Sequence, residues 1–265
     1  MPHRSSPEVA VIGGSGFYSF LDNATEVPVE TPYGSTSAPV AVGDLAGTAV
    51  AFLPRHGRAH EFPPHAINYR ANLWALRSLG VRRILAPCAV GGLRPEVSPG
   101  DIVVPDQLVD RTHRRLQTYV DSGAAHVPFA DPYCRDLANA LAATTSDIKS
   151  GGTMVVVEGP RFSTRAESQH YAAQGWTLIN MTGHPEAVLA RELSMCYLSI
   201  ALVTDMDAGV SAEHAVNQEQ VFAAFAENTE RLKGILGHAI SELPARGNCG
   251  CATWADGLDL PFELP

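Results

Sequence analysis

Short apolar runs alternate with amphipathic segments along most of the chain. Near-continuous runs of Val, Ile and Leu are typical of strands that are buried on both faces of a sheet. We therefore expect strands at residues 8–14, 48–54, 83–90, 101–109, 153–158, 177–181 and 196–205. Apolar residues at helical spacing predict helices at residues 67–79, 132–143, 164–174, 185–195 and about 218–243.

No repeat, linker or low-complexity segment interrupts this alternation. It predicts an α/β fold, in which a single domain at residues 1–245 holds a mixed central β-sheet flanked by helices. The remaining tail, residues 246–265, is rich in Gly, Asp and Pro. Its apolar side chains, such as Trp254 and Phe262, would be unusual in free solution. We expect the tail to pack on its own or a neighbouring subunit.

Composition narrows the classes of partner. The chain has 265 residues, a formal net charge of −9 and a pI near 5.5. Nucleic-acid binding needs a broad basic surface, so no nucleic-acid partner is expected. No apolar run approaches the roughly 20 residues of a membrane span, and the first residues lack the apolar segment of a signal peptide. We expect no membrane partner and a cytoplasmic location.

The five cysteines fall into two groups. Cys88, Cys134 and Cys196 stand apart in apolar segments and are interpreted as small buried hydrophobes. Cys249-Gly-Cys251 lacks both the usual ligand spacing and the partner ligands of a zinc site, so no metal is expected. A strained disulfide and a pair of free thiols in a mobile tail both remain open, and a reducing compartment favours thiols.

The segment Arg55-His56-Gly57-Arg58-Ala59-His60 concentrates four potentially cationic side chains in an acidic protein. It follows an apolar run that ends at Pro54, which places it at the carboxyl end of a predicted strand. Ligand sites collect at such ends in α/β sheets. Arginine and histidine can donate hydrogen bonds to phosphate or carboxylate, so the segment indicates a site for a small anion. The alternative is a solvated loop whose charges pair with nearby acids.

Five other predicted strands also end in polar turns that contain glycine. Gly13-Gly14-Ser15-Gly16 can form an anion-binding nest, although this signal is weak and it is not a Walker loop. The other turns contribute Ala89, Phe162 and Ser163, Asn180 to Thr182, and Asp205 with Asp207. Their meeting at one sheet edge would form a single composite pocket. A carboxyl group such as Asp205 can accept from an amine and, when protonated, donate to a ring nitrogen.

Taken in order, these motifs resemble the 5′-methylthioadenosine phosphorylase branch of the trimeric purine nucleoside phosphorylase family. The resemblance runs from Gly13 to about Asp207. It is carried by the Gly-Gly-Ser-Gly turn, the Arg55–His60 segment, 68-Asn-Tyr-Arg-Ala-Asn-72, 99-Pro-Gly-Asp-Ile-Val-103, 158-Glu-Gly-Pro-Arg-Phe-Ser-163, 180-Asn-Met-Thr-182 with 185-Pro-Glu-186, and 204-Thr-Asp-Met-Asp-207.

The resemblance implies phosphorolysis, in which phosphate attacks C1′ of a purine nucleoside and the base leaves. It implies a set of phosphate contacts at Ser15, Arg55, His56, the backbone of Ala89, and Thr182. It also implies that the nucleoside meets Phe162, Ser163, Asn180, Met181 and Gln218. Asp205 would act on N7 of the base with support from Asp207. No cofactor is implied, because inorganic phosphate is a co-substrate.

In this family a carboxylate at the Asp205 position accompanies 6-aminopurines, and an asparagine accompanies 6-oxopurines. The resemblance therefore implies cleavage of 5′-methylthioadenosine to adenine and 5-methylthioribose-1-phosphate. Polar residues near the 5′ end, His214, Asn217 and Gln218, and Cys88 in place of a threonine depart from the pattern. They keep open an enzyme for 6-oxopurine nucleosides or for another 5′ substituent. His126 corresponds to a residue that neighbouring subunits share, which implies a homotrimer.

Overall fold

The chain folds around a mixed β-sheet with helices packed on two sides. The computed structural model describes residues 6–14, 17, 20–45, 47–208, 218–245 and 249–265. The strands are β1 Val9–Gly13, β2 Thr25–Val27, β3 Val40–Leu45, β4 Thr48–Pro54, β5 Arg83–Gly92, β6 Ile102–Val104, β7 Gln107–Arg111, β8 Lys149–Ser150, β9 Thr153–Val157, β10 Leu178–Asn180 and β11 Cys196–Met206. The helices are a short 3₁₀ turn at Pro64–Ala66, α1 Tyr69–Ser78, α2 Arg135–Thr144, α3 Arg165–Ala173, α4 Gly183–Glu192 and α5 Gln218–Ser241.

The order of the strands explains where a site can form. β1 lies between β4 and β5, all three are parallel, and β11 runs parallel to β5 along its length. β10 pairs antiparallel with the last residues of β5 and continues the sheet through β9 and β7. The carboxyl ends of β1, β4, β5 and β11 therefore meet at one edge, which is where the polar turns were expected to converge.

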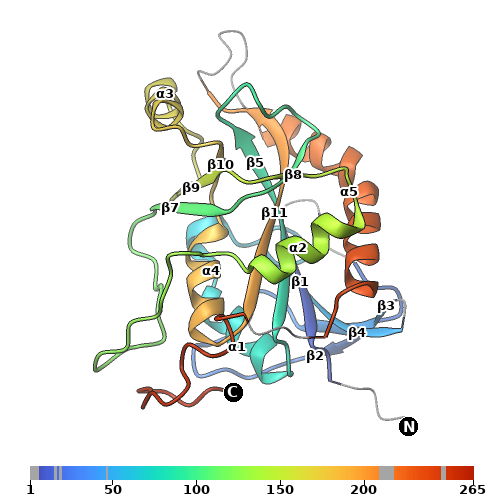
Figure 1. The fold of residues 1–265 in the computed structure, drawn as a ribbon, viewed down its shortest axis with the longest axis vertical. Coiled ribbons are helices and arrows are strands. Elements are labelled where there is room, and N and C mark those ends of the chain that lie inside the picture. Colours follow the sequence, from blue (N-terminus) through green and yellow to red (C-terminus); the bar gives the residue numbers. More distant parts are fainter. Residues whose placement is uncertain (1–5, 15–16, 18–19, 46, 209–217, 246–248) are drawn as a thin grey trace.

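Helices cover both sides of the central strands. Figure 1 shows α1 and α4 on one side of β5 and β11, with α5 on the other and α2 beside it. The apolar residues that repeat at helical spacing along α5 differ in burial between its start and the rest of the helix. Phe225, Leu232, Leu236 and Ile240 are buried in the core, whereas Val221 and Phe222 nearer its start are only partly buried. None of the described helices is long and apolar enough to cross a membrane.

The expected fold class is confirmed, and two details of the prediction were wrong. The single strand expected at 101–109 is two strands, β6 and β7, which separate at Pro105. Proline has no N–H for a ladder, and β6 pairs with β11 and β8 whereas β7 pairs with β9. The antiparallel β2 and β3 and the short β8 were not predicted. Gly43 and Asp44 interrupt the apolar run of β3, so its pattern is weak.

The end of the chain lies on the body of the same subunit. The ring of Phe262 lies 6.4 Å from that of Trp74 and 5.8 Å from that of Tyr119, measured between centroids. Cys251 is only 5% exposed, which differs from the mobile tail that the sequence suggested. Cys134 and Cys196 are buried as expected, but they do not stand apart, because their sulfurs lie beside those of Cys249 and Cys251.

Candidate active site

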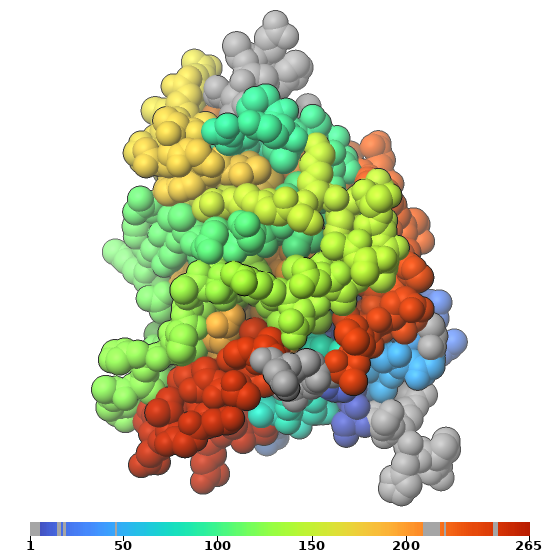
Figure 2. All heavy atoms as spheres, in the orientation of Figure 1, coloured from blue at the N-terminus to red at the C-terminus, as the bar shows by residue number. Residues whose placement is uncertain are grey.

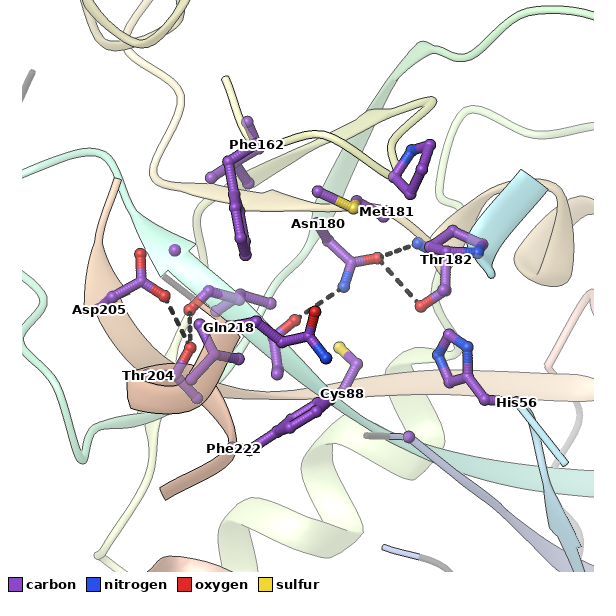
Figure 3. Close-up of a pocket in the computed structure, with 18 of the residues that line it drawn as sticks. His56, Cys88, Phe162, Asn180, Met181, Thr182, Thr204, Asp205, Gln218 and Phe222 are labelled. Carbon is purple, nitrogen blue, oxygen red and sulfur yellow. Dashed lines mark hydrogen bonds between the residues drawn. The ribbon is translucent and has the colours of Figure 1, made fainter. Parts of the chain in front are cut away.

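A cavity of about 300 Å³ opens at the carboxyl ends of β4, β5 and β11. This size is at the lower end of the range for pockets that hold small molecules. Eleven of the residues predicted for the site line it: Arg55, His56, Ala89, Phe162, Ser163, Asn180, Met181, Thr182, Asp205, Asp207 and Gln218. Figure 3 shows an elongated arrangement, with Asp205 at one end and His56 and Thr182 at the other.

Arg55 does not project freely into the cavity. Its side chain is 1% exposed, and its Nε and Nη2 donate to the two carboxylate oxygens of Glu186 at 2.7 and 2.8 Å. Nη1 donates to the Pro87 carbonyl at 3.2 Å and Nη2 to the Ile12 carbonyl at 3.3 Å. These four bonds leave one of the five guanidinium donors for a ligand. The ion pair also neutralises the charge that the sequence assigned to anion binding.

His56 presents a defined tautomer to the cavity. Its Nδ1 lies 2.8 Å from the Phe62 carbonyl oxygen, which can only accept, so Nδ1 carries the proton. Burial lowers the pKa of His56 to about 3, and the positive charge of Arg55 acts in the same direction. The ring is therefore neutral near pH 7, with an acceptor lone pair at Nε2. A protonated oxygen of phosphate is the complementary partner for this nitrogen.

Asn180 shapes the turn that carries Thr182. Its Nδ2 donates to the Ala89 carbonyl at 3.0 Å, which ties the end of β10 to β5. Its Oδ1 accepts from the backbone N–H groups of Thr182 and Gly183, both at 2.7 Å. These contacts make Asn180 a positioning residue that holds the Thr182 hydroxyl at the cavity (Figure 3).

A bulge in β11 brings Thr204 and Asp205 to the same cavity. The register against β5 shifts between Val203 and Asp205, so Thr204 is the extra residue. Strict alternation would place neighbouring side chains on opposite faces of the sheet, and a bulge relaxes this rule. The Thr204 hydroxyl lies 2.8 Å from Asp205 Oδ2, to which it can donate (Figure 3).

Gly91 makes room for both carboxyl groups. A Cβ atom on this glycine would lie 2.9 Å from Ile179 Cγ2 and 3.2 Å from both Asp205 Oδ1 and Asp207 Cβ. The two acids therefore approach the β5 backbone more closely than a side chain would allow. Asp207 is 3% exposed and accepts a short hydrogen bond from the Ser168 hydroxyl.

Both carboxyl groups bind protons more readily than free aspartate. Burial raises the pKa of Asp205 to about 6, the charge of Asp207 adds to the effect, and the hydrogen bond from Thr204 opposes it. Burial also raises the pKa of Asp207, against the hydrogen bond from Ser168. A carboxyl group that titrates near neutral pH can deliver a proton to a ligand, which makes Asp205 the candidate acid.

Aromatic and thioether side chains supply flat apolar surfaces between the two ends. Phe162 and Met181 lie across the cavity from Phe222 and Gln218, which come from the first turns of α5 (Figure 3). Sequence reasoning gave no lining role to Val221, Phe222 and Thr204, and it placed His60 at the site only as part of the Arg55–His60 segment. Val221 and Phe222 belong to the row of apolar residues predicted along α5. Their position could have been anticipated, because this apolar row begins before the part of the helix that packs in the core.

Arg115 donates hydrogen bonds to backbone carbonyls of two segments next to the cavity. Its Nη1 donates to the carbonyls of Met181 and His184 at 2.9 and 2.6 Å, and its Nη2 donates to the Glu158 carbonyl at 2.7 Å. Its Nε also contacts the Glu158 carboxylate at 3.1 Å. One buried cation therefore connects the turns after β9 and β10. No sequence motif singled out Arg115, because its partners lie more than 40 residues away.

The remaining predicted residues have different outcomes. Ser15, His214 and Asn217 lie outside the described residues. His126 is exposed and is not among the described residues that line the cavity. Arg58 is not among them either and pairs with Glu26 at the surface, so the loop alternative holds for this residue alone.

Two further side chains lie near His56 in the cavity. Cys88 does line the cavity, with Sγ 3.4 Å from the Ser199 hydroxyl, and burial raises the pKa of its thiol. His60 stacks on His56 with ring centroids 4.3 Å apart.

The chain is similar to known proteins over most of its length. The chain is 58% identical to an S-methyl-5′-thioadenosine phosphorylase from Mycolicibacterium smegmatis, over 97% of this chain and 99% of the relative. It is 54% identical to a purine nucleoside phosphorylase from Streptomyces coelicolor over the full length of both chains. A methylthioadenosine phosphorylase from Schistosoma mansoni, solved with adenine, superposes with a TM-score of 0.85 at 36% identity, covering 89% of this chain and 91% of that one. The model of the phosphorylase superfamily matches residues 8–241, and the chain therefore belongs to the phosphorylase superfamily.

Proposed function

We propose that this enzyme cleaves 5′-methylthioadenosine with inorganic phosphate, giving adenine and 5-methylthioribose-1-phosphate. The observation that carries the proposal is the pairing of Asp205 and Asp207 at one end of a cavity whose other end presents neutral hydrogen-bonding groups for phosphate. S-methyl-5′-thioadenosine phosphorylases with 46–58% identity support it. So does a related Schistosoma mansoni adenosine/methylthioadenosine phosphorylase variant, solved with methylthioadenosine.

The reaction follows from the layout of the cavity. A phosphate oxygen forms a bond to C1′ while the bond from C1′ to N9 breaks and its electron pair goes to the purine. A protonated Asp205 gives its proton to N7, so adenine leaves as a neutral base. Its carbonyl oxygen accepts from the 6-amino group, and Asp207 raises the pKa of Asp205 through its charge. Phe162 packs on the base, and Met181 contacts the ribose.

At the phosphate end, binding uses neutral groups rather than a free cation. The Thr182 hydroxyl, the remaining N–H of Arg55 and Nε2 of His56 face the ligand, and Ser15 and the Ala89 backbone complete the proposed set. Because Nε2 accepts when His56 is neutral, the site favours a phosphate that carries a proton on one oxygen. These groups hold the phosphate beside C1′, and the negative charge of the bound phosphate stabilises the positive charge that develops on the ribose.

A substrate panel tests this function. Purified enzyme should release adenine from 5′-methylthioadenosine only when phosphate is present, and the sugar product should carry phosphate at C1′. Varying the 6-position and the 5′ substituent separately shows which of the two substituents determines substrate selectivity. Turnover of inosine and guanosine with none of 5′-methylthioadenosine would overturn the proposal.

The second candidate is a purine nucleoside phosphorylase for 6-oxopurine nucleosides or for another 5′ substituent. The name of the Streptomyces coelicolor relative favours it, and so does the amide of Gln218 at the cavity, where an apolar methylthio group would need no polar partner. The preference for a 6-amino or a 6-oxo group on the purine distinguishes the two candidate functions. A buried acceptor facing a 6-oxo group is a mismatch that costs about 1–3 kcal/mol.

We further propose a homotrimer in the cytoplasm, in which His126 of each chain enters the site of a neighbour. The exposed position of His126 in the segment between β7 and α2 is compatible with this role. Light scattering after size exclusion should give three chains per particle. Mixing His126→Ala chains with Asp205→Asn chains should restore activity, because some mixed sites would contain both original residues. Monomers with full activity would contradict the shared site.

A further inference from the structure

Four of the five cysteines converge on one point at the base of the molecule. The sulfur atoms of Cys134, Cys196, Cys249 and Cys251 all lie within 4.8 Å of one another, and those of Cys196 and Cys249 are 3.3 Å apart. Three of the four residues are buried, and all are free thiols. From the sequence no metal was expected, because Cys249-Gly-Cys251 has neither the usual ligand spacing nor partner ligands nearby in the chain. The fold supplies those partners from residues 53 or more positions earlier in the chain.

We propose that these four cysteines bind one Zn²⁺ ion as a closed structural site. Zinc held by four thiolates is tetrahedral, with bonds of about 2.3 Å that separate the sulfurs by about 3.8 Å. The 3.3 Å between Cys196 and Cys249 and the upper limit of 4.8 Å for all pairs lie on either side of this value. Four sulfurs around one centre fit a single tetrahedral ion better than two separate disulfides, which need contacts only within each pair.

Cys134 and Cys196 are held in place by backbone hydrogen bonds that do not involve the tail. Cys134 is the residue before α2, and its N–H donates to the Tyr197 carbonyl at 2.9 Å. Cys196 is the first residue of β11, and its N–H donates to the Arg82 carbonyl at 2.8 Å. Two ligands are therefore fixed by the sheet and a helix, and the Cys-Gly-Cys turn brings the other two to them.

The surroundings suit a site with excess negative charge. Four thiolates and one Zn²⁺ carry a net charge of −2, and binding releases four protons from the thiols. Arg191 lies close enough to Cys251 to act on it electrostatically, and its Nη atoms donate to the carbonyls of Pro128 and Asp131 just before Cys134. The N-terminus of α2 adds a partial positive charge beside Cys134.

An entry path is also present. A surface cavity of about 710 Å³ is lined by Cys134, Cys196 and Cys249, together with residues of α2 and the end of α5. An ion can reach the sulfurs through it without unfolding of the sheet. Figure 2 shows the C-terminal segment, in dark red, lying across this face of the molecule below α2.

The ion would fasten the tail rather than take part in catalysis. Cys196 begins β11 and Asp205 lies nine residues further along it, a separation of about 30 Å at roughly 3.3 Å per residue. The ligands join the start of α2, the start of β11 and the tail that carries Phe262. Loss of zinc should therefore lower the melting temperature.

Metal analysis of the full-length chain tests the proposal. Protein produced without a histidine tag and purified without chelators should contain about one zinc per chain, measured by plasma mass spectrometry. Cys251→Ser and Cys134→Ser should reduce zinc to background. Cys88→Ser is the matched control for metal content, because this buried thiol lies outside the cluster, and it should retain the zinc.

Two measurements on the unaltered chain remain informative even if a variant does not fold. A mercurial reagent added stepwise with a zinc-sensitive dye should release zinc as four thiols are titrated. Replacement by Co²⁺ should give the strong visible bands of a tetrahedral thiolate site. Protein from zinc-supplemented cells that holds no zinc, holds iron instead, or yields these cysteines as disulfides would overturn the proposal.

Discussion

Arg55 and Glu186 form a two-contact ion pair in which both side chains are almost completely buried, at 1% and 0% exposure. The Tyr197 hydroxyl also donates to Glu186 Oε2 at 2.8 Å. The residue with the clearest anion-binding signature is therefore also a structural element of the core. In the proposed function, Arg55 contacts phosphate through the one guanidinium donor that Glu186 and the backbone carbonyls leave.

Breaking this pair should destabilise the enzyme. Arg55→Met or Glu186→Gln leaves one buried charge without its partner, which typically costs about 3–5 kcal/mol. The double variant should lose clearly less than the sum of the two single losses, because no unpaired charge remains. Urea denaturation of the four proteins measures this coupling. If Arg55→Met only weakened phosphate binding and left the denaturation midpoint unchanged, the pair would have no structural role.

The activity should follow the protonation of Asp205. Its pKa of about 6 in the folded chain means that the acid form dominates below this pH and is lost above it. The value of kcat/KM for the nucleoside, which reports the free enzyme, should therefore fall as pH rises through about 6. Asp205→Asn should abolish this step in the profile. His56 should add no step between pH 5 and 8, because its pKa lies at about 3.

Asp205→Asn should also change the choice of base. An asparagine amide can donate to a 6-oxo group, and the carboxyl group it replaces accepts from a 6-amino group. The ratio of kcat/KM for 5′-methylthioadenosine to that for 5′-methylthioinosine should fall by about tenfold or more, which corresponds to the 1–3 kcal/mol of a mismatched buried pair. An unchanged ratio would mean that Asp205 does not determine the selectivity between 6-amino and 6-oxo purines.

Gly91→Ala should disturb both carboxyl groups at once. The added Cβ would crowd Ile179 and approach Asp205 and Asp207, as its 2.9 and 3.2 Å distances show. We expect a loss of about 10- to 100-fold in kcat/KM, as is typical when catalytic groups are displaced by small distances.

The matched control for this substitution is Gly234→Ala in α5. An added Cβ there meets no atom within 4 Å. This change should leave kcat/KM unaltered and stabilise the helix by roughly 0.5–1 kcal/mol. Equal losses of activity in both variants would argue against the crowding explanation.

Much of the pocket was predictable because its signals are local. The apolar runs of β4, β5 and β11 and the polar turns that follow them are short stretches of sequence, and parallel strands place their carboxyl ends at a common edge. This placed Arg55 and Asp205 at one site without reference to any structure. It does not account for Asn180, which ends a strand that runs antiparallel to β5. The same reasoning could not find Thr204, because the bulge that turns it to the cavity depends on pairing between β11 and β5.

The sequence by itself determined the α/β fold class, the order of the polar turns and the residue types that gather at the sheet edge. Only the tertiary structure decided how those side chains are used. Glu186 lies 131 residues from Arg55, and Cys134 lies far from the Cys249-Gly-Cys251 turn that it meets. Local patterns report which residues are buried, whereas partners distant in the chain are selected by packing. That is why the arginine predicted to bind phosphate proved to be part of a buried ion pair, and why four cysteines scattered along the chain proved to lie together.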